Sequence, residues 1–244
     1  MRVPLREVAP GVLVATSRVM QTTSTVVVDA GRALLIDPAW MPDELDALAA
    51  ALRERGLVVA EGFATHAHHD HLLWHPSFGN VPRWASARTA ELAAVERDAL
   101  VAALGAEFPA ELVELMGRVD AGSPRFDVEL VVHDGHAPGH TAVWLPGPRV
   151  LVAGDMLSDV ELPLPFDPDD VVAYERALDV LDPYAREARV VIPGHGSVGS
   201  DALARLEADR RYLADVREAG ESRDPRRANE GMAEEYERLR VLLG

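Results

Sequence analysis

Short apolar runs alternate with helical patterns along the chain, and turn residues separate them. Three runs near the start predict strands, at Val12–Ala15, Thr25–Val28 and Ala33–Ile36. The sequence Asp29-Ala30-Gly31-Arg32 between the last two runs predicts a hairpin turn. Pro42 then stands where the first residue of a helix would, and Gly56 predicts the end of that helix.

The same alternation continues to the end of the chain. A strand over 57–64 leads into a cluster of histidines, and Ser86 caps a predicted helix to about Leu104, with another over about 109–116. Later strands are predicted over 128–132, 142–145, 150–153 and 190–192, with a helix over 169–181. The segment from about 200 to 244 is predicted to be helical, and Ser200 or Asp201 is expected to cap its first helix. This order fits mixed sheets covered by helices in an α+β fold, and we predict one domain over 1–244.

Composition and charge exclude some classes of function and disfavour others. The chain has 24 basic and 40 acidic residues and a net charge of −16, which disfavours nucleic acid as a partner. No cysteine is present, so disulfides and thiolate chemistry are excluded. No apolar run approaches the roughly 18 residues needed to cross a membrane, and the first residues do not resemble a secretory signal. We therefore expect a cytoplasmic protein that acts on a small molecule, and a homodimer remains open.

The main chemical feature is the sequence Thr65-His66-Ala67-His68-His69-Asp70-His71, which directly follows a predicted strand. Burying so many ionisable groups is costly unless something satisfies them, and a metal ion does so. Neutral imidazoles and carboxylates suit zinc, manganese or iron. In a tight turn, His66 and His68 could face one ion while Asp70 and His71 face another.

Three later positions offer further ligands. His140 lies in Ala137-Pro138-Gly139-His140, Asp155 follows an apolar strand and Gly154, and His195 follows Ile192-Pro193-Gly194. Each has a neighbouring glycine, which lets the backbone turn sharply and approach a ligand closely.

This pattern resembles the metallo-β-lactamase superfamily in its dinuclear-hydrolase form, as in glyoxalase II-like and lactonase-like enzymes. The resemblance covers roughly Val12 to His195. It implies a four-layer αββα sandwich with two metal ions at one edge. By the resemblance, the first ion is held by His66, His68 and His140, the second by Asp70, His71 and His195, and Asp155 bridges them. Asp37 resembles an early aspartate that supports the histidine loop.

The function that the resemblance implies is hydrolysis. A hydroxide held by two zinc ions, with manganese or iron as alternatives, would attack the carbonyl of an ester, thioester or lactone. Asp70 is also a candidate catalytic residue because its carboxylate could help to shuttle a proton.

Other functions within this superfamily remain as alternatives. An iron-dependent oxidoreductase of the persulfide dioxygenase kind would use one iron, and the intact second set of ligands argues against it. A nuclease is opposed by the charge of −16. A secreted β-lactamase is disfavoured by Asp155 and by the absence of a signal peptide, and a glyoxalase II by the short chain that follows His195.

The remaining candidates have simpler interpretations. We expect His69 to point outward or to support a ligand from behind, and His133 and His136 to lie in a surface turn. The apolar residues that could line a substrate wall are expected to be ordinary packing residues: Met20, Trp74, Phe78 and Phe166. Residues 86–120 form either a lid over the metals or a peripheral helical hairpin.

Overall fold

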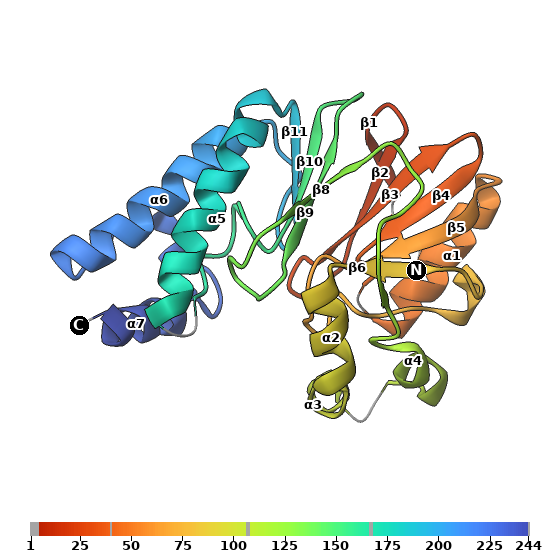
Figure 1. Ribbon diagram of the computed structural model, residues 1–244, viewed down its shortest axis with the longest axis horizontal. Coiled ribbons are helices and arrows are strands. Elements are labelled where there is room, and N and C mark those ends of the chain that lie inside the picture. Colours follow the sequence, from red (N-terminus) through yellow and green to blue (C-terminus); the bar gives the residue numbers. More distant parts are fainter. Residues whose placement is uncertain (1–4, 40, 106–107, 166–167, 244) are drawn as a thin grey trace. The chain divides into compact units, whose positions relative to one another are not determined.

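The computed structural model describes residues 5–39, 41–105, 108–165 and 168–243. The chain divides into two compact units, Met1–Leu130 and Val131–Gly244. Whether they form the predicted single domain stays a prediction, and each unit is described by itself. Figure 1 shows the helices and strands of both. Within the described ranges, no helix is both long and apolar enough to cross a membrane.

The sheet of the first unit has seven strands in chain order. They are β1 (Arg6–Ala9), β2 (Val12–Thr16), β3 (Thr23–Asp29), β4 (Arg32–Ile36), β5 (Val58–Phe63), β6 (Arg83–Ala85) and β7 (Asp120–Ala121). The first four pair antiparallel, and β4 to β7 pair parallel. The strands predicted from the apolar runs are therefore confirmed, and β1, β6 and β7 are additions to them.

The hairpin between β3 and β4 forms where the turn sequence predicts it. Asp29 pairs with Arg32, which leaves a two-residue loop. Both loop residues have positive φ, 48° at Ala30 and 80° at Gly31. Such a loop matches the right-handed twist of the two strands.

The helices of the first unit are α1 (Pro42–Glu54), η1 (Pro76–Phe78), α2 (Ala87–Val95), α3 (Arg97–Leu104) and α4 (Ala110–Leu115). Helix α1 begins at Pro42 as predicted and buries Leu45, Leu48 and Leu52 in the core. The prediction of one continuous helix from Ser86 to Leu104 is wrong, because the helix breaks at Glu96 into α2 and α3. The Ser86 side chain accepts a hydrogen bond from Thr89 N and caps α2 as expected.

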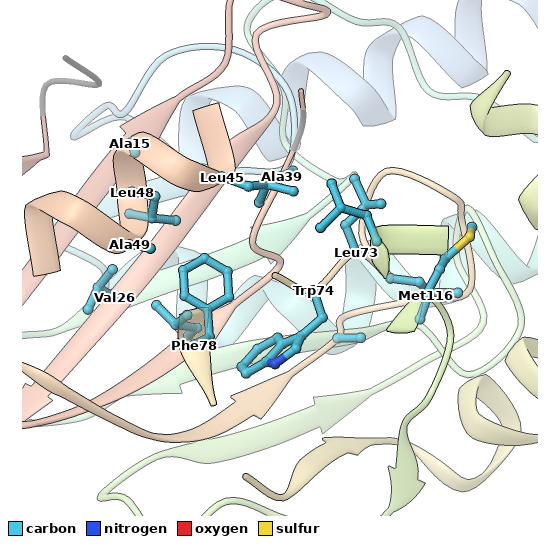
Figure 2. Packing of buried hydrophobic residues seen from close by; sticks show 14 of the residues in the cluster. Ala15, Val26, Ala39, Leu45, Leu48, Ala49, Leu73, Trp74, Phe78 and Met116 are labelled. Atoms are coloured by element: carbon cyan, nitrogen blue, oxygen red, sulfur yellow. The ribbon is translucent and has the colours of Figure 1, made fainter. Parts of the chain in front are cut away.

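The aromatic residues near η1 belong to the hydrophobic core, as predicted. Trp74 and Phe78 are both buried, and their rings meet edge to face with centroids 5.2 Å apart. Figure 2 shows both rings among the aliphatic side chains of this cluster. Met20 is exposed, and Phe166 lies outside the described residues.

Residues 86–120 are built into the first unit. Their helices bury Leu100, Leu112 and Met116 in its core, and β7 extends its sheet. Gly117 N donates a 3.0 Å hydrogen bond to Leu72 O, directly after the histidine-rich loop. A role for this segment as a lid stays a prediction.

The second unit contains a four-stranded sheet in the order β11-β10-β9-β8. Its elements are β8 (Glu129–Val132), β9 (Thr141–Leu145), β10 (Val150–Gly154), α5 (Pro168–Glu187), β11 (Val190–Pro193), α6 (Ala202–Ala219), η2 (Pro225–Ala228) and α7 (Met232–Leu243). One face of the sheet packs against α5 and α6. All four predicted strands are confirmed, and so is the helical character of the segment after residue 200.

Two helix ends differ from the sequence expectation. Helix α5 continues through Pro183 to Glu187, beyond its predicted end at 181. Asp201 is the N-cap residue of α6, but its side chain makes no capping bond. Instead, Asp201 Oδ1 accepts a 2.9 Å hydrogen bond from Arg205 Nε.

A buried arginine ties the C-terminal segment to the loop after β10. Arg226 Nη1 donates to Ser158 O and Glu161 O, both at 3.0 Å, and to Asp209 Oδ1 at 2.6 Å. The same guanidinium pairs with Asp224 at 2.8 Å. We call this set of contacts the Arg226 clamp.

Gly62 in β5 leaves the space that the Trp74 ring occupies. A Cβ at this position would lie 2.6 Å from Trp74 Cζ3 and 3.2 Å from Arg83 Cγ. We predict that Gly62→Ala lowers the free energy of unfolding by about 1–3 kcal/mol through overpacking, measured by denaturant titration. Gly147→Ala is the matched control, because nothing lies within 4 Å of its added Cβ. Equal stability of the two variants would contradict this account.

Candidate metal centre

The histidine-rich loop of the first unit follows β5 directly. His66, Asp70 and His71 are all almost completely buried, and His68 is half-buried. His71 N donates a 3.1 Å hydrogen bond to His68 O, which closes a tight turn. The turn brings the imidazoles together, with the ring centroid of His66 4.5 Å from that of His68 and 4.2 Å from that of His71.

The side-chain donors of this loop face one another. His66 Nε2 lies 3.0 Å from His68 Nδ1, and His71 Nε2 lies 3.4 Å from Asp70 Oδ2. His69 is the exception, since its side chain is partly exposed and its Nδ1 is 3.6 Å from Asp70 Oδ1. Two pairs of potential ligands are therefore preformed within the first unit.

Asp37, directly after β4, orients this loop. Its Oδ1 accepts a 2.8 Å hydrogen bond from Thr65 N, and its Oδ2 accepts one of 2.6 Å from the Thr65 hydroxyl. Oδ2 also lies 3.0 Å from His71 Nδ1. A carboxylate at Nδ1 fixes the tautomer of the ring and leaves Nε2 available as a metal ligand.

The far end of the loop is held by its backbone. Leu72 O accepts hydrogen bonds from Gly117 N at 3.0 Å and from Arg83 Nη2 at 3.1 Å. The loop is thus fixed at both ends by groups from other parts of the first unit, which limits the loss of conformational freedom when a ligand binds.

The second unit contributes a turn between β8 and β9 with three histidines. The expectation that His133 and His136 lie in a surface turn is wrong, because both side chains are buried. The rings of His133 and His140 stack with centroids 4.7 Å apart. Burial lowers the pKa of His133 to about 4, so this ring is neutral at neutral pH.

Asp155, directly after β10, is the centre of the second unit's cluster. Its Oδ2 lies 3.2 Å from His136 Nε2 and 3.3 Å from His195 Nε2. His140 reaches the same residue differently, because its Nε2 accepts a 3.1 Å hydrogen bond from the backbone N of Asp155. His195 is anchored through its carbonyl, which accepts a 2.8 Å bond from Ser158 Oγ.

Glycine makes room for the Asp155 carboxylate. Gly194 N donates a 2.5 Å hydrogen bond to Gly154 O, so the ends of β10 and β11 approach closely. A Cβ at 194 would overlap Asp155 Oδ1 and lie 3.0 Å from the carbonyl carbon of Gly154. The glycine that precedes His195 thus determines where a carboxylate on the neighbouring strand can lie.

The residues present fit divalent metal ions. Each unit places buried imidazoles within about a hydrogen-bond length of a buried carboxylate at the ends of its strands. Neutral imidazole and carboxylate are the donors that zinc, manganese and iron accept, and a divalent ion offsets the cost of burying the carboxylates.

Sequence reasoning selected most of these residues but not His136. The structure brings His66, His68, Asp70, His71 and Asp37 together in the first unit, and His140, Asp155 and His195 in the second. His136 joins the second set because its backbone has φ 69°, a conformation that an L side chain seldom adopts and that the sequence does not announce. In the sequence, the one feature that could have identified His136 as a candidate ligand is its position four residues before His140.

A model of the Metallo-beta-lactamase superfamily matches residues 17–195. The chain belongs to this superfamily. A curated relative, metallo-beta-lactamase type 2 from Bacteroides fragilis, is 37% identical over 71 residues. That match spans 28% of this chain and 28% of the relative.

Solved structures of the superfamily share the fold. DIM-1 metallo-beta-lactamase has a TM-score of 0.63 and 22% identity, with 88% of this chain and 99% of that chain covered. A metallo-beta-lactamase family protein from Thermus thermophilus has a TM-score of 0.64 and 23% identity, covering 86% and 82%. A beta-lactamase domain protein from Burkholderia ambifaria has a TM-score of 0.65 and 22% identity, covering 88% and 75%. The predicted fold class, the α+β metallo-β-lactamase fold, is confirmed.

The contact between Asp37 and His71 can be tested by a single-atom change. Asp37 has φ 48°, which asparagine tolerates well, so Asp37→Asn should keep the backbone and remove the charge. We expect zinc affinity to fall by roughly 10- to 100-fold, measured by competition with a chromophoric chelator. Asp127→Asn, at an exposed aspartate, is the control. An unchanged zinc affinity in Asp37→Asn would remove Asp37 from the site.

Gly194→Ala should displace the Asp155 carboxylate without changing any potential ligand. We expect bound metal per chain, measured by plasma emission spectroscopy, to fall by at least about half, since a candidate carboxylate ligand moves. The Gly147→Ala variant should bind metal normally, because its Cβ meets nothing within 4 Å. Full metal content in Gly194→Ala would show that Asp155 is not a ligand.

Proposed function

We propose that this member of the superfamily is a hydrolase that holds two divalent metal ions and cleaves an ester, thioester or lactone of a small molecule. The observation that carries the proposal is the pair of buried histidine and carboxylate sets at strand ends, one in each unit. Superfamily membership supports a metal-dependent reaction.

The proposed ligands follow the superfamily pattern. They are His66, His68 and His140 for one ion, Asp70, His71 and His195 for the other, and Asp155 between them. His136 is an additional candidate, since its Nε2 lies 3.2 Å from Asp155 Oδ2, about as close as His195 Nε2 at 3.3 Å. Zinc is proposed as the metal, with manganese or iron accepting the same donors.

The chemistry that divalent ions supply is the polarisation of a carbonyl and a lowered pKa for water, from about 15.7 to about 7. The chain's own residues position those ions and manage protons. Asp37 holds His71 in one tautomer through Nδ1, and the Thr65 hydroxyl lies 3.0 Å from His66 Nδ1 and restrains the second ring. The Asp70 carboxylate is the group proposed to accept and release a proton.

Negative charge bears on the substrate class. A net charge of −16 opposes the binding of polyanions, which disfavours nucleic acid and favours a small neutral or weakly charged substrate. A small ester, thioester or lactone meets that condition. A cytoplasmic location and a homodimer stay as predictions.

Metal content and turnover test the proposal together. We expect two ions per chain in protein purified without chelator, and hydrolysis within a panel of lactones, thioesters and nitrophenyl esters. His140→Ala should lower turnover by more than the roughly 10- to 100-fold typical of a group outside the ligand set. His69→Ala is the matched control, because it lies in the same loop with a partly exposed side chain.

The alternatives give different results in the same experiment. Oxygen uptake with one iron per chain and no hydrolysis would identify an oxidoreductase and refute the proposed reaction. Full turnover in His140→Ala together with a loss in His136→Ala would instead exchange the roles of these two histidines.

A further inference from the structure

A cavity of about 510 Å³ lies within the first unit, and no histidine of the metal loop lines it. Its walls come from the segments after Trp74 and before β7, and β6 contributes Arg83. Most of the lining side chains are apolar, and they include Trp74, Pro76, Val81, Pro82, Leu115 and Val119. A cavity of this size and composition is typical of sites for small organic ligands.

Arg83 is the polar centre of this cavity. Its side chain is 9% exposed and stacks on Trp74, with the guanidinium carbon 4.9 Å from the ring centroid. Nη1 donates to Leu115 O at 2.6 Å, and Nη2 donates to Leu72 O at 3.1 Å. These bonds use two of the five N–H donors that a guanidinium carries.

The charge of Arg83 is not neutralised by the protein. Among the described residues, the neighbouring charge that acts most on Arg83 is the like charge of Arg118, and no carboxylate is paired with Arg83. Burial lowers the pKa of Arg83 to about 9, which still leaves the side chain cationic at neutral pH. A buried cation without a counter-ion is strongly unfavourable, so an anion that enters this cavity would relieve that cost.

The rim of the cavity limits the charge of such an anion. Arg118 and Asp120 also line it, and Arg118 is paired with Glu114 at 3.1 Å. The charged residues that line the cavity itself are Arg83, Arg118 and Asp120, so the lining carries one net positive charge. A monoanion matches it, and a planar carboxylate fits the parallel donors of a guanidinium.

We propose that this cavity binds an organic monocarboxylate, with Arg83 as its counter-ion and the Trp74 side of the cavity receiving its apolar body. The occupant would contact a side chain that also holds Leu72 O, the first carbonyl after His71. The Arg83 guanidinium therefore contacts both the cavity and the backbone at the end of the metal loop. None of the proposed metal ligands lines the cavity.

Phenylacetate and its neutral analogue phenylacetamide are suitable probes. Trp74 Nε1 donates to Gly79 O at 3.1 Å, and both residues line the cavity, so the indole N–H resonance of Trp74 reports on occupancy. In metal-loaded protein, we expect phenylacetate to shift this resonance saturably and to leave that of Trp144, in β9, unchanged. Phenylacetamide should bind at least about tenfold more weakly because it lacks the charge. A carboxylate bound only at the metals would not give this pattern.

Two variants and a control complete the test. Arg83→Met should weaken phenylacetate binding at least about tenfold, and Val119→Trp should abolish it by filling the cavity while keeping Arg83. The second variant guards against a folding defect in the first, since Arg83 also bonds two carbonyls. Arg88→Met, at an exposed arginine that is paired with Glu91 and does not line the cavity, should bind as the parent does. Equal binding of acid and amide, or parent-like affinity in Val119→Trp, would overturn the proposal.

Discussion

The candidate metal-binding loop of the first unit depends on the hydrogen bonds of the Asp37 carboxylate. Asp37 is buried at the end of β4, in a left-handed backbone conformation that residues other than glycine, asparagine and aspartate seldom adopt. In this conformation both oxygens contact the neighbouring loop, where they bind the backbone and hydroxyl of Thr65 and the ring of His71. An aspartate at this position therefore fixes the orientation of the imidazole.

Sequence patterns were sufficient where a local rule decides the structure. The Ala30-Gly31 loop, the start of α1 at Pro42 and the cap at Ser86 each follow from residues within a few positions. Strands β6 and β7 were missed because three and two residues carry no readable periodicity and pair only through the tertiary fold. The break at Glu96 likewise has no proline or glycine to announce it.

The site shows the same division. The loop from His66 to His71 could be nominated from composition alone, because so many ionisable groups after an apolar strand need a common partner. The contact between His136 and Asp155 could not, since it depends on a positive φ and on the space that Gly194 leaves on another strand. Local sequence therefore identifies which residues can bind a metal, whereas long-range backbone approach determines which of them converge.

The Arg226 clamp has a consequence for where the functional domain ends. The superfamily match stops at residue 195, but the loop carrying Ser158 and Glu161 depends on a guanidinium well beyond that point in the chain. Asn229 adds a 2.7 Å bond to Val160 O, and Ser158 in turn holds the carbonyl of His195. A recombinant fragment that ends at residue 195 would lack Arg226 and Asn229, and so it would lose their hydrogen bonds to that loop. For cloning or domain-swap work, the C-terminal helices belong to the same compact unit as Asp155 and His195.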